Sequence, residues 1–211
     1  SNNKFLTNQR LILLVACLLI SPTYILGQDL GSSSGSFEDL GGASTHGTKS
    51  GVSHFTVADD EAAIQMARDL CDLLPQNNLE RPPSKKTNDP IDRSCDALDS
   101  IMPDQATKAY DVVDVITEIL DDGGFLEVQA DWAQNIVVGF GHLGGHTVGV
   151  VANQPKVLAG CLDIDASDKA ARFVRFCDAF NIPIITLEDV PGFLPGTNQE
   201  WGGIIRHGAK L

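Results

Sequence analysis

The sequence predicts an α/β fold, in which two strands, a helix and a further strand follow one another in the second half of the chain. Three observations carry this prediction. Apolar residues recur at helical spacing in three segments, β-branched residues form runs at 136–140 and 147–151, and a short apolar run lies at 184–187. The chain has 211 residues, 43% of them hydrophobic and 6% aromatic, which is enough for a folded core.

The first predicted helix covers about residues 60–74, where apolar residues recur every three or four positions and acidic residues stand at the start. Pro75 ends it. The following stretch, 76–106, is rich in proline and scattered charges, and we expect a connecting strap without much regular structure. A second helix is expected from about Thr107 to Leu120, stopped by the glycines at 123 and 124.

The runs at 136–140 and 147–151 flank the glycines between 141 and 145, so they predict a β-hairpin. Ser167 and Asp168 are expected to cap the next helix, which ends near Pro183. A strand at 184–187 and a loop rich in proline and glycine follow. One such unit leaves a sheet edge unpaired, so we expect the chain to be a piece of a longer polypeptide.

Charge and cysteine content exclude several classes of protein. The formal net charge is −13, which gives no electrostatic basis for binding nucleic acid or an anionic membrane. The cysteines are odd in number, widely spaced and without a C-x-x-C pair, so neither a disulfide framework nor a thiolate zinc site is expected. A reducing compartment is therefore favoured.

The N-terminal segment points the other way. In residues 1–27, two basic residues precede an apolar run at 11–20, as in a signal peptide. Ten apolar residues are too few to span a bilayer, which needs about 20. The alternative is a fused leader or mispredicted exon unrelated to the fold. Residues 28–38, which contain GSSSGS, are expected to be a flexible linker.

Three familiar motifs fail on spacing. A phosphate loop at 42–50 would need lysine directly after the second glycine, but Thr48 intervenes. A calcium loop beginning at Asp163 would need glycine and glutamate where Asp168 and Val174 stand. His142 and His146 lack a third zinc ligand nearby in sequence, so exposed turn histidines are the better interpretation.

The loop after the strand at 184–187 is the best candidate site. Ligands of α/β sheets gather at the carboxyl ends of strands, and glycines at 192 and 196 let backbone amides approach a ligand closely. Gly202, Gly203 and Gly208 follow in an early helix. They fit either a close ligand contact or tight packing between elements, and the sequence leaves both open.

Three segments carry a family resemblance: GGASTHGTKSGV at 41–52, TKAYDVVDVI at 107–116, and the long block that begins with NQPKVLAG at 153 and runs to 211. They resemble the carboxyltransferase (β) subunits of biotin-dependent acyl-CoA carboxylases, most of all those of propionyl-CoA type, from about residue 39 onward. The resemblance implies an incomplete crotonase-like fold of ββα units. Residues 39–75 would end the N-terminal lobe, 76–106 would be the strap, and 107–211 would begin the C-terminal lobe.

In that family a carboxylate passes from carboxybiotin to the α-carbon of an acyl-CoA, and two oxyanion holes stabilise the enolates formed. The resemblance puts a loop on the carboxybiotin side, followed by two helix glycines, and a glycine-rich segment in the N-terminal lobe. The loop residues are Pro191, Gly192, Phe193, Leu194, Pro195, Gly196 and Thr197, the helix glycines are Gly202 and Gly203, and the N-lobe residues are Gly41, Gly42, Ser44, His46 and Gly51. No catalytic residue and no metal ligand is assigned, because the family's oxyanion loops lie outside this chain.

The resemblance implies biotin as cofactor, carried on a biotin carboxylase or biotin carrier subunit, acyl-CoA as substrate, and further β subunits as partners. It places the protein in the mitochondrial matrix or cytoplasm, which conflicts with the leader-like segment. We expect the chain alone to be inactive. The alternatives are a noncatalytic assembly remnant of the complex or a secreted binding protein.

Overall fold

The computed structural model describes residues 36–105 and 108–211. The chain divides after Cys71 into two compact units, and each is described by itself. The leader-like segment at 1–27 and most of the expected linker lie outside the described residues. Within the described ranges, no helix is both long and apolar enough to cross a membrane.

The first unit holds the helices α2 (Phe37–Gly41) and α3 (Ala43–Thr48) and all but the last two residues of α4 (Asp60–Leu73). α4 confirms the helix predicted from the apolar spacing. α2 begins inside the stretch that was expected to be a linker, because Ser36 and Asp39 form a capping box. The Ser36 amide and hydroxyl donate to the Asp39 carboxylate, and these hydrogen bonds lower its pKa.

The second unit is built on one mixed four-stranded sheet of β1 (Phe125–Val128), β2 (Ile136–Leu143), β3 (His146–Asn153) and β4 (Ile184–Leu187). The strands lie in sequence order, β1 to β3 antiparallel and β4 parallel to β3. The predicted hairpin is confirmed as β2–β3, and Gly144 and Gly145 form its turn at φ 58° and 78°. The predicted last strand is confirmed as β4.

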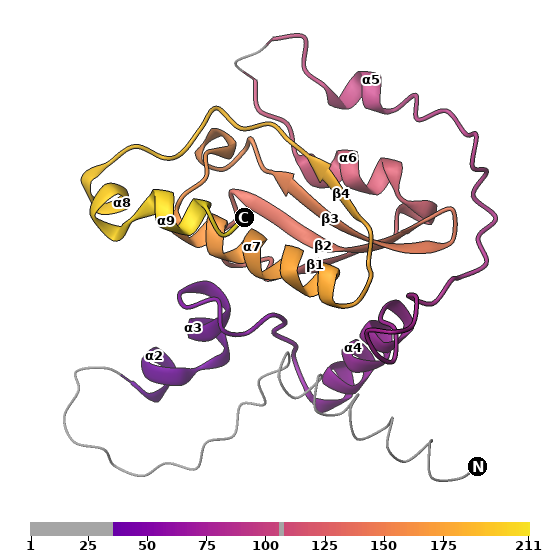
Figure 1. The fold of residues 1–211 in the computed structure, drawn as a ribbon, viewed down its shortest axis with the longest axis horizontal. Coiled ribbons are helices and arrows are strands. Elements are labelled where there is room, and N and C mark those ends of the chain that lie inside the picture. The colour runs from indigo at the N-terminus through magenta and orange to yellow at the C-terminus, as the bar shows by residue number, and fades with distance from the viewer. Residues whose placement is uncertain (1–35, 106–107) are drawn as a thin grey trace. The chain divides into compact units, whose positions relative to one another are not determined.

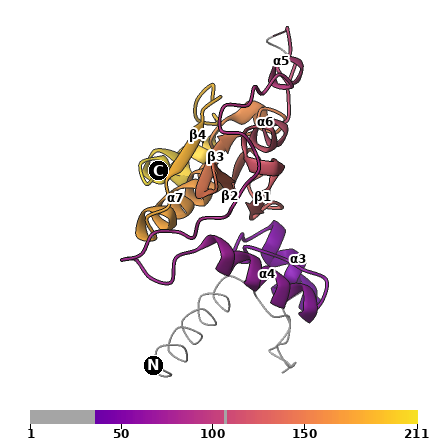
Figure 2. The ribbon, with the colours of Figure 1, turned by 90° about the vertical axis from the view of Figure 1, so that its right-hand side faces the viewer.

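Helices cover both faces of this sheet, with α6 (Val112–Ile119) on one face and α7 (Ile164–Ala179) on the other (Figures 1 and 2). β2 and β3 are accordingly buried along most of their length, which explains why their sequences are continuous apolar runs rather than alternating ones. The remaining helices are α5 (Leu98–Ile101), α8 (Thr197–Gly202) and α9 (Ile204–Gly208), with 3-10 turns at Asp121–Gly123 and Leu158–Gly160.

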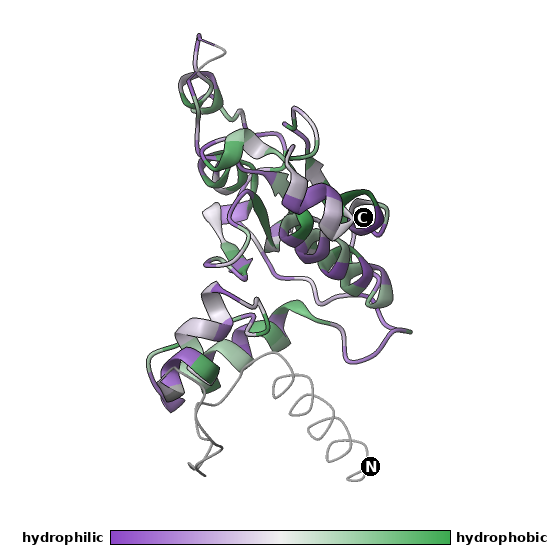
Figure 3. Ribbon diagram, turned by 90° about the vertical axis from the view of Figure 1, so that its left-hand side faces the viewer, coloured by the Kyte–Doolittle hydropathy of each residue, from purple (hydrophilic) through white to green (hydrophobic). Residues whose placement is uncertain are grey.

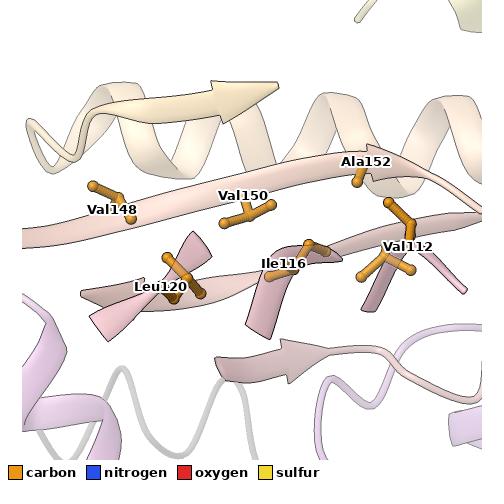
Figure 4. Packing of buried hydrophobic residues seen from close by; sticks show 7 residues of the cluster. Val112, Ile116, Leu120, Val148, Val150 and Ala152 are labelled. Atoms are coloured by element: carbon orange, nitrogen blue, oxygen red, sulfur yellow. The ribbon is translucent and has the colours of Figure 1, made fainter. Parts of the chain in front are cut away.

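The core between α6 and the sheet is a row of aliphatic side chains. Val112, Ile116 and Leu120 recur every four residues and point at the sheet. Figure 4 shows them facing Val148, Val150 and Ala152, which share one face of β3. Burying each valine, leucine or isoleucine here contributes about 1.5–3 kcal/mol.

The opposite face packs on α7 through aromatic rings. The Phe140 ring lies 4.9 Å from that of Phe173, centroid to centroid. Gly149 leaves room for this helix, since a Cβ there would lie 2.7 Å from the Cys177 sulfur. α7 carries hydrophobic and hydrophilic residues along its length, as Figure 3 shows, which is typical of a helix with one buried face.

Lys169 is an exception to that pattern, because its side chain is fully buried. Its ammonium group donates to the carbonyl oxygens of Gln129 at 2.9 Å, Trp132 at 2.7 Å and Ala133 at 3.4 Å. Burial lowers the pKa of Lys169 to about 8, against the opposing effect of nearby carboxylates. The lysine thereby fixes the turn between β1 and β2, where Gln129 and Ala133 have positive φ.

Two sequence predictions need correction, and one strand was missed. The helix expected from Thr107 begins at Val112, because the Asp111 carboxylate accepts from the Val113 amide and caps it there. α7 begins three residues before Ser167, because the carboxylate of Asp163 caps it instead. Strand β1 was not predicted at all.

The strap at 76–106 has little regular structure, as expected. It is hydrogen-bonded at several points to the hairpin and helix of its own unit. The Lys85 amide donates to the Gly145 carbonyl at 2.8 Å, and the Thr147 hydroxyl donates to the Pro83 carbonyl at 3.2 Å. Further along, the Arg93 guanidinium donates to the Glu118 carbonyl at the end of α6. The strap is thus held along the hairpin turn and the last turn of α6.

Candidate functional site

The loop 191–197 leaves the carboxyl end of β4, the edge at which parallel strands present ligand-binding loops. Gly192 and Gly196 have φ of 145° and 143°, a backbone conformation that is essentially restricted to glycine. A Cβ at either position would meet nothing within 4 Å, so the glycines are required by the backbone and not by crowding. Six of the seven loop residues are exposed, which leaves the loop open to a ligand or to another chain.

Two backbone hydrogen bonds hold the middle of the loop against Leu162. The Leu162 amide donates to the Gly192 carbonyl at 3.1 Å, and the Leu194 amide donates to the Leu162 carbonyl at 2.8 Å. Leu162 and Phe193 therefore form an isolated parallel bridge. An exposed loop pinned in this way keeps a defined shape, as a binding loop must.

The entry of the loop is fixed at Asp189. Its amide donates to the Asn153 side-chain oxygen at 3.3 Å, and its carboxylate accepts from the Tyr110 hydroxyl at 2.9 Å. Burial and this hydrogen bond raise the pKa of Tyr110 to about 12. A Cβ on Gly160 would lie 2.5 Å from the Asp189 carbonyl oxygen, so only glycine permits this approach.

Sequence reasoning missed Tyr110, Asn153 and Asp189 as parts of the candidate site. Each of the last two stands at or just beyond the carboxyl end of a strand, which is the signal that could have found them. No signal in the sequence pairs Tyr110 with Asp189, because the two are 79 residues apart.

The glycines after the loop pack against neighbouring elements. A Cβ on Gly202 would lie 2.4 Å from Ile164, and one on Gly208 would lie 2.4 Å from the Phe193 ring. Gly203, at φ 83°, ends α8 and begins α9. Tight packing is observed at Gly202 and Gly208 and a backbone break at Gly203, whereas a ligand contact at Gly202 and Gly203 stays a prediction.

α9 is also bound to α7 through charged groups. The Asp168 carboxylate contacts His207 at 2.8 Å and Lys210 at 2.9 Å. Partial burial acts to raise the pKa of Asp168, but these hydrogen bonds outweigh it and lower the pKa below its usual value. The contact stabilises the helices that follow the loop.

The N-lobe segment lies in the other unit, and it is mostly helical where the sequence suggested a glycine-rich turn. Gly41 ends α2, Gly42 separates α2 from α3, and Ser44 and His46 lie in α3. A Cβ on Gly42 would collide with the Glu38 carbonyl, and the His46 imidazole contacts the Ser50 hydroxyl at 3.0 Å. Gly51 has φ 61°. These glycines shape a tight two-helix corner.

In the parts of the chain that the structure describes, no group of three His, Cys, Asp or Glu side chains gathers so that it could hold a metal ion. His142 lies within β2, where burial lowers its pKa, and His146 begins β3. The Asp163 carboxylate caps α7.

A comparison with known protein families identifies the family of the chain. The profile of the carboxyl transferase domain matches residues 13–211. The chain belongs to this family. The match begins earlier than residue 39, where the resemblance seen in the sequence began, and it includes part of the leader-like segment.

Carboxyltransferase relatives cover most of this chain. The carboxyltransferase subunit of propionyl-CoA carboxylase from Haloferax mediterranei is 59% identical over 175 residues, 83% of this chain and 34% of that subunit. The mitochondrial propionyl-CoA carboxylase β chain of Homo sapiens is 55% identical over 174 residues, 82% of this chain and 32% of that one. The chain thus spans about a third of the length of the curated relatives it matches.

The solved structures agree. The crystal structure of transcarboxylase 12S, described as a hexamer assembly with hydrolysed methylmalonyl-coenzyme A bound, superposes with a TM-score of 0.81 at 52% identity. The superposition covers 84% of this chain and 34% of the transcarboxylase chain. The predicted fold class, α/β and crotonase-like, is confirmed.

Proposed function

We propose that this carboxyltransferase-domain chain forms the carboxybiotin side of an acyl-CoA carboxylase of propionyl type, with loop 191–197 as its contact to carboxybiotin. The reaction would move a carboxylate from carboxybiotin to the α-carbon of the acyl-CoA. One observation carries the proposal. The loop is exposed at the carboxyl end of β4 and pinned to Leu162, within a chain that is 59% identical to a propionyl-CoA carboxylase subunit.

The residues of the loop suit a ureido ring. The biotin that carries this ring would arrive on a partner subunit and would supply the transferable carboxylate. The exposed backbone of Gly192 and Gly196 lets a planar polar group approach without meeting a side chain, and Phe193, 42% exposed, offers an apolar surface beside them. The role of the chain's own residues is to hold and orient the ring that carries the carboxylate.

The partners and location follow from the same proposal. The chain would act within an oligomer of carboxyltransferase subunits, together with a biotin carrier subunit and acyl-CoA. We place it in the mitochondrial matrix or the cytoplasm, where acyl-CoA is available. The N-lobe segment with Gly41, Gly42, Ser44, His46 and Gly51 would belong to the acyl-CoA side.

A chimera tests the proposal. The 174 residues that match the human β chain replace their counterparts in it. The chimera is assembled with its biotin-carrying partner to test for carboxylation, and KM values are measured on the β-subunit oligomer with free carboxybiotin added as substrate. We expect propionyl-CoA carboxylation by the chimera. Gly192→Ala should raise the KM for carboxybiotin at least about fivefold and leave the KM for propionyl-CoA within about twofold, because only the biotin side is altered.

Gly144→Ala is the matched control, since Gly144 also has positive φ but lies in the hairpin turn. It should lower stability without moving either KM. A chimera that folds and assembles but does not carboxylate propionyl-CoA would contradict the proposed function. If Gly192→Ala raised only the KM for propionyl-CoA, the assignment of the loop to carboxybiotin would be contradicted.

A further inference from the structure

The turn that supports the loop is strained. Leu158, Ala159 and Gly160 are three consecutive residues with left-handed backbone, at φ 51°, 53° and 74°. Leucine and alanine rarely adopt this conformation, and they keep it only where the surroundings hold them in place. Such strain is typical of functional sites.

Asn153 holds the turn from inside. It is the last residue of β3, its side chain is 6% exposed, and its amide nitrogen donates to the Gly160 carbonyl at 3.0 Å. Its amide oxygen accepts from the Asp189 amide at 3.3 Å. One buried side chain thus bridges the strained turn and the residue at which the loop begins.

The loop is consequently fixed at two levels. Asn153 fixes it at Asp189, and Leu162, two residues beyond the strained turn, fixes it at Gly192 and Leu194. The segment 160–162 contacts the loop at both levels, because Gly160 lies against the Asp189 carbonyl oxygen and Leu162 pairs with Phe193. A shift of the turn would therefore move the loop.

We infer that Asn153 is a positioning residue. Through the strained turn it sets the position of loop 191–197 relative to the sheet, and it thereby determines how the loop meets carboxybiotin. The identity of the ligand, carboxybiotin, rests on the proposed function, whereas the control of the loop position by Asn153 does not. Asparagine suits this task because its amide offers a donor and an acceptor in one plane, and both are used. Its burial excludes water, which would otherwise compete for both bonds.

Two measurements on the chimera separate the control of the loop position from the binding of carboxybiotin. Asn153→Ala should speed hydrogen exchange of the 158–162 and 189–197 amides by about tenfold or more, while the β2–β3 ladder keeps its protection. The same variant should raise the KM for carboxybiotin at least about fivefold and leave that for propionyl-CoA within about twofold. A merely structural role would affect both substrates or neither.

Asn153→Asp is the second variant, since it keeps the acceptor for the Asp189 amide but loses the donor to Gly160. It should loosen the turn more than the loop entry. Thr147→Val is the matched control: Thr147 is buried on the same strand, and its hydroxyl donates to the strap at Pro83 instead. It should leave loop exchange and both KM values unchanged.

Tyr110→Phe keeps the test decisive if Asn153→Ala does not fold. It removes the other bond to Asp189 from a half-buried site, and a smaller increase in exchange at 189–197 is expected. Unchanged loop exchange in Asn153→Asp and Tyr110→Phe would overturn the positioning role. Faster loop exchange with an unchanged KM for carboxybiotin would instead overturn the assignment of the loop to biotin.

Discussion

Replacing Lys169 by methionine should change how the stability of the chain depends on pH. The folded pKa of Lys169 is lowered from 10.5 to about 8 by burial. Between these values the unfolded chain holds the proton and the folded chain does not, so the free energy of unfolding rises with pH. At 1.36 kcal/mol per pKa unit, the full rise is about 3 kcal/mol. Below pH 8 both states are protonated and the contribution is constant.

At neutral pH the substitution has two opposing effects. Methionine removes the buried charge, but it leaves the Trp132 carbonyl without its ammonium partner, which costs about 1–3 kcal/mol. The Gln129 and Ala133 carbonyls each keep a backbone donor, from Trp132 and Ile136. We therefore expect wild type and Lys169→Met to differ little at pH 7, and wild type to become the more stable by up to about 3 kcal/mol at pH 10.5.

Urea unfolding followed by circular dichroism at a series of pH values measures this difference. Lys108→Met is the control, because it removes one exposed lysine of the same unit. Its stability curve should run parallel to that of wild type. If the Lys169→Met curve also runs parallel from pH 7 to 10.5, the ammonium is not perturbed by burial and the reasoning is refuted.

Three further predictions concern single side chains. Tyr110→Phe should abolish the late phase, near pH 12, of an absorbance titration of tyrosinate, and leave the phase of the chain's other tyrosine; a wild-type titration complete near pH 10 would contradict this. Asp121→Asn should destabilise the chain by about 1–3 kcal/mol in urea unfolding, because the carboxylate accepts both amides of the hairpin turn at 2.8 and 2.6 Å, whereas Asp122→Asn at an exposed position should not. Gly149→Ala should lower stability by about 1–3 kcal/mol through overpacking against Cys177, and an unchanged urea midpoint would show that α7 can shift away.

Local sequence patterns predicted the elements whose own residue types favour one secondary structure. The hairpin β2–β3 and strand β4 were predicted because β-branched runs and the turn glycines point to one structure. Helix starts were less certain. Asp163 and Ser167 are both good capping residues, and only the packing of α7 on the sheet decides between them.

Nonlocal contacts account for what the sequence could not predict. Strand β1 has few β-branched residues and exists because β2 offers it a partner, with Phe125 opposite Gly141. Lys169 would be placed on the surface by its charge, but a turn some 40 residues earlier in the chain provides carbonyls for it. The candidate loop was predicted from its glycines, whereas its fixing by Asn153 depends on two segments that meet only in the folded chain.

The way the strap is held has a consequence for cleavage experiments. Residues 86–92 lie between the bond from Lys85 to the hairpin turn and the bonds from Arg93 to the end of α6. A protease that nicks this stretch would produce two new ends, each still hydrogen-bonded to the same folded body. The nicked chain should therefore migrate as one particle in native gel filtration and as two peptides only after denaturation.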